Sequence, residues 1–509
     1  MNQTAYAADP VTIAAQKLFR VPYLYPWQRL VIANILDVLR CCETGSAPEP
    51  EIEAWAKQIV LLPTGAGKSL CFLLPAVIDR CTAQGTPPRP TIIIYPLLAL
   101  MADQQRRLSE LGIPYALLRG GQTPQEREEA LRSIEHGARI IIANPEVLES
   151  PRLRKRLCRQ RIIHAVIDEA HCAAEWGDTF RPSYLRVADT IRALNIPVVS
   201  AFTATASPPV LMRIQEILFN GEAHILHGDT DRPNIRYRVV HACNKTNAVL
   251  ELTEQYKKPL LVFCRTRARA EHMAHLCAAL HGAERVRFYH AGLSKEEKKA
   301  AERWFFESTD GIMAATCAYG LGVDKKDIRT VIHLDAPPAP EAYIQEAGRG
   351  GRDGSITTAV LVWSPQDTEQ AAAADSKQQR VFSEYVSGGT CRRTVLLAAM
   401  GETAGVCSGC DVCDGDACST AADAQRVQRF IRAHQGQYTL TQAAQQAARQ
   451  LNAERQKNGL IPIWNEPDIK EVIQRLCMER RIAQKKAWYE KELRLYAPSS
   501  SEGSSAGAF

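Results

Sequence analysis

One short segment carries residues that suit phosphate binding. Residues 64–69 read TGAGKS directly after the apolar run IVLL, so a Gly-rich turn is expected between a strand and a helix. Such a turn lets backbone N–H groups surround phosphate oxygens, while Lys68 reaches the β- and γ-phosphates and Ser69 ligates Mg²⁺. The pattern lacks the first glycine of a complete P-loop, and a chance Lys-Ser in a Gly-rich turn stays the alternative. The candidate nucleotide-binding residues are Thr64, Gly65, Ala66, Gly67, Lys68 and Ser69.

A second segment supplies paired carboxylates. The apolar run IIHAVI at 162–167 is followed by DEAH at 168–171. An acidic residue at the carboxyl end of a strand beside a phosphate-binding turn can hold Mg²⁺, a role we predict for Asp168. Glu169 would then polarise the water that attacks a γ-phosphate. Paired carboxylates on a surface turn are commonly only solvated, so the interpretation depends on the turn at 64–69.

Four cysteines have the spacing of a metal site. Cys391, Cys407, Cys410 and Cys413 follow the pattern C-x15-C-x2-C-x2-C. Thiolates two residues apart on a tight turn suit tetrahedral Zn²⁺, and a distant fourth ligand closes the site. A closed four-sulfur site would be structural, because it leaves no coordination position open for catalysis. An iron–sulfur cluster is the metal alternative, and Cys418 is expected to be a free thiol.

The elements that position these residues follow from the apolar runs. Short runs rich in Ile and Val alternate with segments of helical periodicity, which predicts an α/β chain with two tandem doubly wound parallel sheets. A turn-rich stretch at 227–234 would link them. The first series of runs lies at 59–63, 91–95, 139–143, 162–167 and 197–201, and the second at 259–264, 285–290, 311–316, 330–335 and 358–363.

The order of the motifs resembles superfamily 2 helicases and, more specifically, the RecQ family of DNA helicases. The resemblance runs from about residue 19 to residue 418 and implies two RecA-like domains. Its motifs in the first domain are GKSLCFLLPA (67–76), YPLLALMADQ (95–104), ANPEVL (143–148), VIDEAHC (166–172) and FTATA (202–206). Those in the second are DRPNI (231–235), VFCRTR (262–267), YHAGL (289–293), ATCAYGLGVDKKDIR (315–329) and QEAGRGGRDG (345–354).

The resemblance implies roles for further residues around ATP and Mg²⁺. Gln28 would read the adenine edge, and Asp324 would face the nucleotide from the second domain. Arg349 and Arg352 would act as arginine fingers that stabilise the transferring phosphate. Thr203 and Thr205 would couple ATP hydrolysis to domain movement.

An aromatic-rich loop at 174–184 resembles the family's sensor of single-stranded DNA. Trp176 and Phe180 could stack on bases and Arg181 could contact phosphate, although aromatic residues that merely anchor a surface loop are the alternative.

The sequence departs from the family pattern in three places. Asp178 and Thr179 replace a His-Asp pair in the aromatic-rich loop, and Lys326 replaces a proline. Val21 and Tyr25 stand where an aromatic residue and an arginine usually clamp adenine, so adenine selectivity is less secure.

The C-terminal module carries most of the positive charge. Residues 421–509 hold 14 Lys or Arg against 9 Asp or Glu, whereas the first 420 residues hold 48 against 47. Helices are predicted at 421–434, 441–453 and 467–480, followed by a hairpin with its turn near Glu490, the layout of a winged helix. Trp488 or Tyr489 is the candidate wedge between base pairs, with a core role as the alternative. The cations expected to meet duplex phosphates are Arg481, Lys485, Lys486 and Lys491.

Composition and order give the remaining predictions. With 46% hydrophobic and 23% charged residues, a start without a signal peptide and no long apolar run, the chain is expected to be cytoplasmic, nucleoid-associated and bacterial-type, with reduced thiols and no membrane contact. The predicted domains are 1–209, 210–364, a zinc-binding segment 365–418, a winged-helix-like module 419–498 and a disordered tail 499–509.

The predicted function is ATP-dependent unwinding of duplex DNA in repair, recombination or replication. Resemblance implies 3′→5′ movement on single-stranded DNA by a monomer, with other DNA-repair proteins as partners. The alternatives are an RNA helicase and a DNA-stimulated ATPase that does not separate strands.

Overall fold

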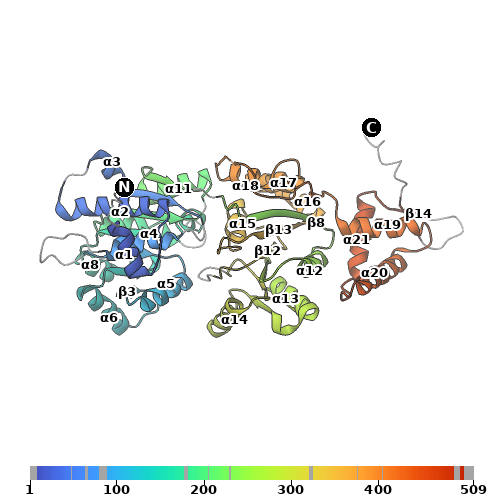
Figure 1. The fold of residues 1–509 in the computed structure, drawn as a ribbon, viewed down its shortest axis with the longest axis horizontal. Helices are drawn as coiled ribbons and strands as arrows, with labels where there is room; N and C mark the ends of the chain where they lie inside the picture. Colours follow the sequence, from blue (N-terminus) through green and yellow to red (C-terminus); the bar gives the residue numbers. More distant parts are fainter. Residues whose placement is uncertain are drawn as a thin grey trace, which may run out of the picture. The chain divides into compact units, whose positions relative to one another are not determined.

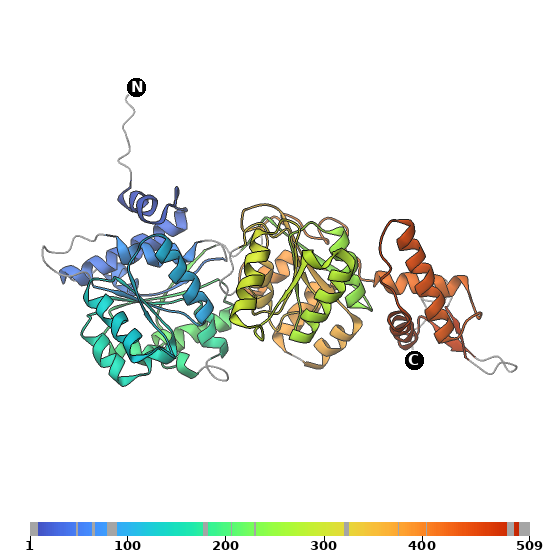
Figure 2. The ribbon, with the colours of Figure 1, turned by 90° about the horizontal axis from the view of Figure 1, so that it is seen from below.

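The chain folds into two compact units, each built on one parallel sheet. The computed structural model describes residues 9–46, 49–63, 67–78, 89–176, 182–204, 206–228, 231–319, 325–374, 376–403, 405–485 and 493–497. One unit comprises Met1–Arg232 with Leu321–Val323, and the other comprises Pro233–Gly320 with Asp324–Phe509. Figures 1 and 2 show the helices and strands in two views.

The first unit has a seven-stranded parallel sheet in the order β3-β4-β2-β5-β6-β1-β7. Its β-branched runs are buried on both faces, and successive residues of one strand, such as Ile59 and Val60, belong to different hydrophobic clusters. Helices therefore cover both faces (Figure 2). The strands are β1 (Lys57–Leu61), β2 (Thr91–Ile94), β3 (Tyr115–Leu118), β4 (Ile140–Ala143), β5 (His164–Ile167), β6 (Val198–Thr203) and β7 (His224–His227).

Two groups of helices flank this sheet. One hydrophobic cluster contains residues of the sheet and of α1 (Pro10–Phe19), α2 (Pro26–Thr44), α4 (Lys68–Val77) and α5 (Leu98–Glu110). The other contains residues of α6 (Pro124–Glu135), α7 (Pro145–Leu148), α8 (Pro151–Cys158), α9 (His171–Trp176), α10 (Val187–Ala193) and α11 (Pro208–Phe219). The short α3 (Pro50–Ala54) and a 3₁₀ turn at Pro182–Tyr184 complete the unit. The unit continues past the predicted boundary at residue 209, because α11 packs on the first sheet and β7 pairs with β1.

The second unit has a six-stranded parallel sheet in the order β10-β11-β9-β12-β13-β8. Its strands are β8 (Ile235–His241), β9 (Leu260–Phe263), β10 (Val286–Tyr289), β11 (Ile312–Ala315), β12 (Thr330–His333) and β13 (Thr357–Trp363). The helices between these strands are α12 (Lys245–Gln255), α13 (Arg267–His281), α14 (Lys295–Glu307) and α15 (Pro340–Ala347), with a 3₁₀ turn at Ala283–Arg285. The prediction of two doubly wound parallel sheets is confirmed.

The cysteine-containing segment covers one face of the second sheet. Its helices are α16 (Pro365–Ala374), α17 (Lys377–Ser387) and α18 (Arg392–Ala399). Phe382, Tyr385 and Leu396 join Tyr237 of β8 and Leu361 of β13 in one buried cluster. In Figure 1 α17 and α18 lie on the side of the sheet opposite α13. Residues 365–418 therefore share a core with the second sheet.

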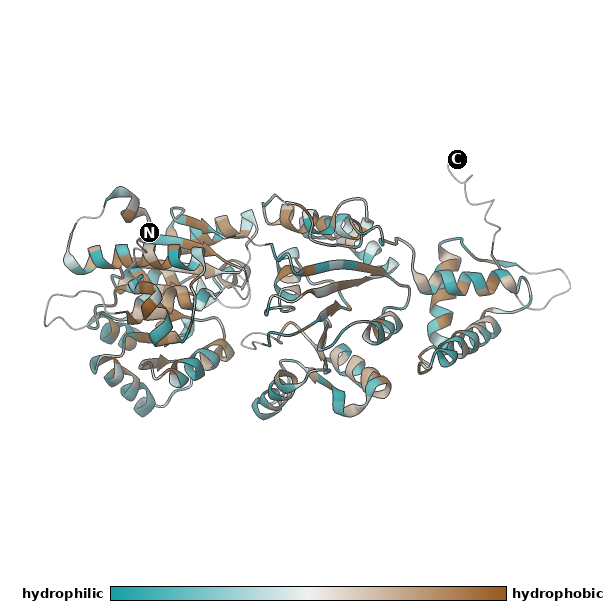
Figure 3. Cartoon of the chain, in the orientation of Figure 1, coloured by the Kyte–Doolittle hydropathy of each residue, from teal (hydrophilic) through white to brown (hydrophobic). Residues whose placement is uncertain are grey.

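The C-terminal module has the predicted order of three helices and a hairpin. It comprises α19 (Ala422–Ala433), α20 (Leu440–Lys457), α21 (Glu466–Met478) and the antiparallel strands β14 (Ala483–Lys485) and β15 (Arg494–Tyr496). The helices carry hydrophobic and hydrophilic residues on different sides (Figure 3), and the hydrophobic ones form a separate core. The predicted hairpin turn, with Lys486, Trp488, Tyr489, Glu490 and Lys491, lies outside the described residues, as does the tail.

Charged side chains join this module to α12. Arg426 donates to both carboxylate oxygens of Glu251 at 2.8 and 2.7 Å, and Arg455 donates to both of Glu254 at 2.9 and 2.7 Å. The buried Asp423 accepts from the backbone N–H groups just before α12. The module is thus attached to the second sheet's domain by ion pairs as well as by the chain.

Within the part of the chain that the structure describes, none of the helices combines the length and hydrophobicity that crossing a bilayer requires.

Candidate active site and metal centre

The predicted phosphate-binding turn lies between β1 and α4. Residues 64–66, which include the predicted Thr64, Gly65 and Ala66, lie outside the described residues. Gly67 stands immediately before α4 with φ +74°, a conformation that favours glycine. The Lys68 Nζ donates to the carbonyl oxygens of Leu62 at 3.1 Å and Pro63 at 3.4 Å. The ammonium of Lys68 is therefore held over the strand–helix turn, and Ser69 follows in the first turn of α4.

Gln28 lies against the same turn. Its side chain is buried near the start of α2, and its Oε1 accepts from the Tyr25 N–H at 2.9 Å. A Cβ at Gly67 would collide with the Gln28 Nε2, so a larger residue would displace the Gln28 amide from this position. The structure thus brings together Gln28 and Gly67, which are 39 positions apart in the sequence.

The positions that depart from the family's adenine clamp have different surroundings. Val21 packs against the hydrophobic core of the first unit. Tyr25 is exposed and stacks on Trp27, with ring centroids 4.6 Å apart and an interplanar angle of 4°. Of the two departing positions, only Tyr25 presents an exposed aromatic ring, and that ring is already stacked on Trp27.

The carboxylates of the second motif stand at the carboxyl end of β5. Glu169 has φ +50°, and its N–H donates to the Asp168 Oδ1 at 3.0 Å. Burial and the neighbouring carboxylate of Glu169 raise the pKa of Asp168 to about 7, against the opposite effect of the Lys68 charge. Two adjacent, poorly solvated carboxylates are oxygen donors of the kind that Mg²⁺ prefers, so the residues present fit this cation.

His171 is a residue of this site to which the sequence analysis gave no role. Its Nδ1 lies 3.0 Å from the Thr203 Oγ1 and 3.4 Å from the Glu169 Oε2. Thr203 ends β6, so this contact links the Glu169 turn to the neighbouring strand. The fourth letter of the DEAH motif was the available signal. Thr205, the predicted partner of Thr203, lies outside the described residues.

The two candidate arginine fingers follow α15 in the second unit. Arg349 is buried, and the Gly-rich loop that holds it is fixed by Asn234, whose Nδ2 donates to the carbonyl oxygens of Gly351 and Ser355, both at 2.8 Å. Gly351 has φ +57°, and a Cβ there would come within 2.5 Å of the Asn234 Nδ2 and the Ser355 carbonyl oxygen. The loop therefore requires glycine at this position.

A bidentate ion pair closes the other side of the arginine loop. The guanidinium of Arg329 donates to both carboxylate oxygens of Asp353, next to Arg352, at 3.0 and 2.7 Å. The exposed Lys326, which replaces the family's proline, accepts from the Asp353 N–H through its carbonyl oxygen at 3.2 Å. Asp324 lies outside the described residues.

Little of the aromatic-rich loop belongs to the described residues. Phe180 and Arg181, with the departures Asp178 and Thr179, lie outside them, and Trp176 is described only as the last residue of α9. Tyr184, at the end of the segment, is fully buried in the core of the first unit. Tyr184 thus anchors the segment to the core, which is the alternative role that the sequence analysis gave to its aromatic residues.

The four predicted metal ligands come together. The sulfur atoms of Cys391, Cys407, Cys410 and Cys413 all lie within 4.8 Å of one another. Cys391 precedes α18; burial opposes its ionisation, but the N–H and hydroxyl of Thr394 outweigh it, and the pKa of Cys391 is lowered to about 6. Four thiols at this separation fit one Zn²⁺. Cys418 stays outside the cluster and donates to the Thr420 carbonyl oxygen.

Two buried arginines follow Cys391 directly in the sequence. The sequence analysis did not single them out. Arg392 donates to both oxygens of Asp411 at 2.8 and 3.2 Å and lies over the ring of Tyr385. Arg393 donates to the Ile235 carbonyl oxygen at 2.6 Å. Asp411 also accepts from the Val239 N–H at 2.9 Å, so the cysteine segment is tied directly to β8.

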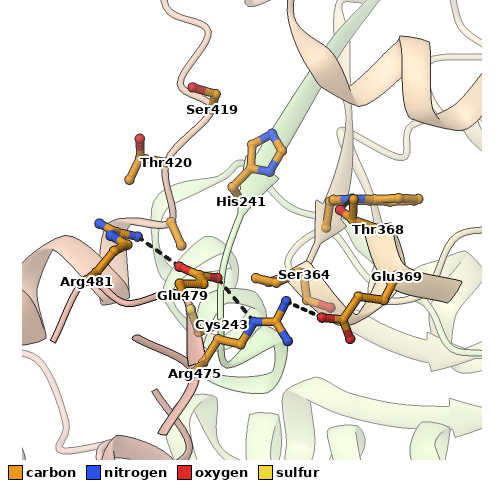
Figure 4. A pocket seen from close by; sticks show the side chains of 13 residues that line it. His241, Cys243, Ser364, Thr368, Glu369, Ser419, Thr420, Arg475, Glu479 and Arg481 are labelled. Carbon is orange, nitrogen blue, oxygen red and sulfur yellow. Dashed lines mark hydrogen bonds and ion pairs between the residues drawn. The ribbon is translucent and has the colours of Figure 1, made fainter. Parts of the chain in front are cut away.

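The predicted DNA-contacting cations of the C-terminal module have different environments. Arg481 lies 3.4 Å from Glu479 and donates to the Gln428 Oε1 at 2.9 Å. It lines a cavity of about 620 Å³, where Arg475 pairs with Glu369 and Glu479 (Figure 4). Lys485 is exposed, with its Nζ 5.7 Å from the ring of Tyr496. Lys485 is therefore better placed than Arg481 to meet a phosphate.

Comparisons with known proteins extend over both sheets. Residues 25–214 match the DEAD/DEAH box helicase family and residues 244–354 match the helicase conserved C-terminal domain. The chain is 37% identical over 316 residues to the probable ATP-dependent DNA helicase RecS of Bacillus subtilis, covering 61% of this chain and 62% of that protein. It is 32% identical over 425 residues to the ATP-dependent DNA helicase RecQ of the same organism, covering 80% and 70%. RecQ of Pasteurella multocida is 30% identical over 370 residues, covering 70% and 57%.

Solved structures support the fold. The DNA-bound DUF1998 helicase MrfA has a TM-score of 0.56 at 19% identity, covering 97% of this chain and 63% of that one. The DEAD-box helicase Mss116 bound to ssRNA and UDP-BeF has a TM-score of 0.56 at 16% identity, covering 92% and 89%.

Proposed function

Since the chain belongs to the RecQ family of ATP-dependent DNA helicases, we propose that it hydrolyses ATP in order to separate the strands of duplex DNA. The observation that carries this proposal is the 32% identity to a RecQ helicase over 80% of the chain, together with the grouping of Gln28, Gly67 and Lys68. The chain spans 62% of RecS and 57% of the Pasteurella RecQ, so the proposal concerns this chain and not every activity of those longer proteins.

The first unit would bind and hydrolyse the nucleotide. Lys68 would leave the carbonyl oxygens of Leu62 and Pro63 and bond to the β- and γ-phosphates. Asp168 and Ser69 would hold Mg²⁺, which supplies charge neutralisation on the phosphate oxygens when bound. Glu169 would accept a proton from the attacking water, with the His171 Nδ1 3.4 Å from its Oε2.

The second unit would supply the arginines. Arg349 and Arg352 would stabilise the negative charge on the transferring phosphate when the two units close around ATP. Asn234 and the Arg329–Asp353 pair keep the arginine loop in one conformation. The loop would therefore lose little conformational entropy when the arginines meet the phosphate. Closing and opening would step single-stranded DNA across the two units, with 3′→5′ polarity by analogy with the family.

We propose that Zn²⁺ binds Cys391, Cys407, Cys410 and Cys413 in a structural role. The site would stabilise a segment that shares its core with β8 and β13. The C-terminal module would contact duplex DNA through the exposed Lys485 and through Lys486, a position predicted from the sequence.

A strand-separation assay tests the proposal. We expect wild-type protein to unwind a 3′-tailed duplex with ATP and Mg²⁺, and to leave a 5′-tailed duplex paired. Lys68→Ala should lower the rate of ATP hydrolysis about 100-fold or more, because it removes a charge aimed at the reacting phosphate. Lys57→Ala, which removes an exposed lysine at the start of β1, is the matched control. Normal ATP hydrolysis by Lys68→Ala would refute the assignment of the site.

Two further measurements separate the alternatives. Stimulation of ATP hydrolysis by single-stranded RNA and not by single-stranded DNA would indicate an RNA helicase. ATP hydrolysis on DNA without strand separation would indicate a remodelling ATPase. A mass of 56.4 kDa in solution is expected for a monomer.

A further inference from the structure

Helix α8 of the first unit has an unusual concentration of positive charge. Residues 152–161 contain six Lys or Arg, and the sequence has no Asp or Glu between Glu149 and Asp168. This charge lies outside the nucleotide site, the aromatic-rich loop and the C-terminal module. Like charges in such density repel one another, so a folded protein gains little from keeping them together without an anionic partner.

Most of these cations have no carboxylate partner among the residues that the structure describes. Arg156 is the exception, because it forms ion pairs with Glu128 and Glu135 of α6, which lies beside α8 (Figure 1). The neighbouring Glu149 is used by Arg186 at 3.1 Å. Across the described ranges of the chain, the side chains of Arg152, Lys155 and Arg159 form no ion pair and no hydrogen bond.

The packing of α8 fixes the direction of these three side chains. Leu153 and Leu157 are 3% and 0% exposed and attach the helix to the core of the first unit. Arg152, Lys155 and Arg159 are separated by three and four residues, so they are neighbours on one face, and all three are exposed. At about 1.5 Å per residue the row is about 10 Å long.

Further positive charge continues the row beyond the end of α8. The Arg89 Nε donates to the Arg161 carbonyl oxygen at 2.9 Å, so Arg89 and the exposed Arg161 lie together. Burial and the positive charge of Arg161 lower the pKa of Arg89. The contact thus brings a further guanidinium to the end of the row, at the backbone of Arg161.

We propose that Arg152, Lys155 and Arg159, continued by Arg161, bind the phosphodiester backbone of DNA at a site separate from the motor motifs. A DNA strand carries one charge per about 3.4 Å of helix axis, so a row of about 10 Å faces about three phosphates. Guanidinium groups suit phosphate oxygens because they donate in pairs. An acidic protein surface is less suitable as the partner, since the hydrophobic side chains of α8 that an interface would use, Leu153 and Leu157, are buried.

Helix α14 offers a matched control. Its exposed Lys295, Lys299 and Arg303 also lie on one helix face, four residues apart. The helix has four Lys or Arg and four Glu, so its charges balance. Replacing three cations by glutamine on either helix changes the net charge of the protein by the same amount.

The experiment measures DNA binding without nucleotide, so its outcome does not depend on the proposed motor activity. Dissociation constants of Arg152→Gln/Lys155→Gln/Arg159→Gln, of Lys295→Gln/Lys299→Gln/Arg303→Gln and of the wild type are measured on labelled single-stranded and duplex DNA between 50 and about 200 mM salt. We expect the α8 variant to bind about tenfold more weakly at the lowest salt, with the slope of log K against log salt reduced by about 2 to 3. The α14 variant should stay within about twofold of the wild type, a change of about 0.4 kcal/mol.

Loss on duplex DNA only, on single strands only, or on both would each support the site and identify the form of DNA that it takes. Equal dissociation constants and slopes for the α8 variant and the wild type would overturn it. Loss of binding to polyglutamate with unchanged DNA binding would also overturn it, in favour of an acidic protein partner. Far-ultraviolet circular dichroism and ATP hydrolysis without DNA check that the α8 variant folds.

Discussion

Replacing Asp411 by asparagine should loosen the attachment of the cysteine segment to β8. The Asp411 and Arg392 side chains are 3% and 1% exposed, and the carboxylate accepts two hydrogen bonds from this guanidinium. Asparagine keeps the shape but removes the charge, and its NH₂ group faces a donor. Removing one partner of a buried ion pair costs about 3–5 kcal/mol. We expect the lower end, because Arg392 also donates to the Tyr385 carbonyl oxygen and lies over the Tyr385 ring.

A cost of about 3 kcal/mol corresponds to an opening equilibrium that is about 100-fold more favourable. Hydrogen exchange measures it locally, which matters because a chain with two units does not unfold in one step. The amide of Val239 is the most direct probe, since it donates to the Asp411 carboxylate. Its exchange should accelerate about 100-fold, and a chelating dye should release Zn²⁺ faster from the loaded protein.

Two variants control this prediction. Asp414→Asn removes an exposed carboxylate from the same segment and should leave both rates unchanged. The double variant Arg392→Met/Asp411→Leu removes both charges and should release Zn²⁺ more slowly than Asp411→Asn, because no buried charge is left alone. Its readout is Zn²⁺ release and not exchange at Val239, whose N–H loses its acceptor in this variant. Equal exchange at Val239 in Asp411→Asn and Asp414→Asn would refute the reasoning.

Three other variants follow from the loops already described. Gly351→Ala, strained at φ +57° and crowded by Asn234, should lower ATP hydrolysis at least about tenfold with ATP affinity kept, as measured by steady-state kinetics and nucleotide binding. Arg329 lowers the pKa of Asp353 from 3.8 to about 2, so the pair stabilises the fold above pH 4 and the stabilisation is lost as pH falls toward 2. After allowance for solvent, Asp353→Asn should cost about 1 kcal/mol at pH 7 and nothing at pH 2, and a cost that is equal at both pH values would contradict this. Cys410→Ser, or removal of Zn²⁺ by a chelator, should make residues 391–413 sensitive to protease, which metal analysis and limited proteolysis would show.

The sheets could be predicted where strands are buried on both faces. β2, β4 and β5 are buried at every position and lie within apolar runs, and each was predicted from such a run. β8 was missed, because Arg236 and Arg238 alternate with its buried residues. β8 lies at the edge of its sheet. Side chains of an edge strand can be partly exposed, so β8 does not need a continuous apolar run.

The candidate site was predictable where residue type and spacing suffice. The four cysteines were assigned from spacing, and the structure brings their sulfur atoms together. The Arg392–Asp411 pair and the contact of Asn234 with the arginine loop join residues 19 and 117 or more positions apart. Ionic and amide side chains usually indicate surface, and only the packing of the chain shows that these are interior.

The joint between α12 and the C-terminal module has a mechanical consequence. The pairs of Arg426 with Glu251 and of Arg455 with Glu254 are largely shielded from water, with side chains 8–30% exposed. Dissolved ions weaken exposed charges much more than shielded ones. Rising ionic strength would therefore weaken binding to the nucleic acid before it weakens these ion pairs. The C-terminal module would then move together with the second sheet as one rigid body.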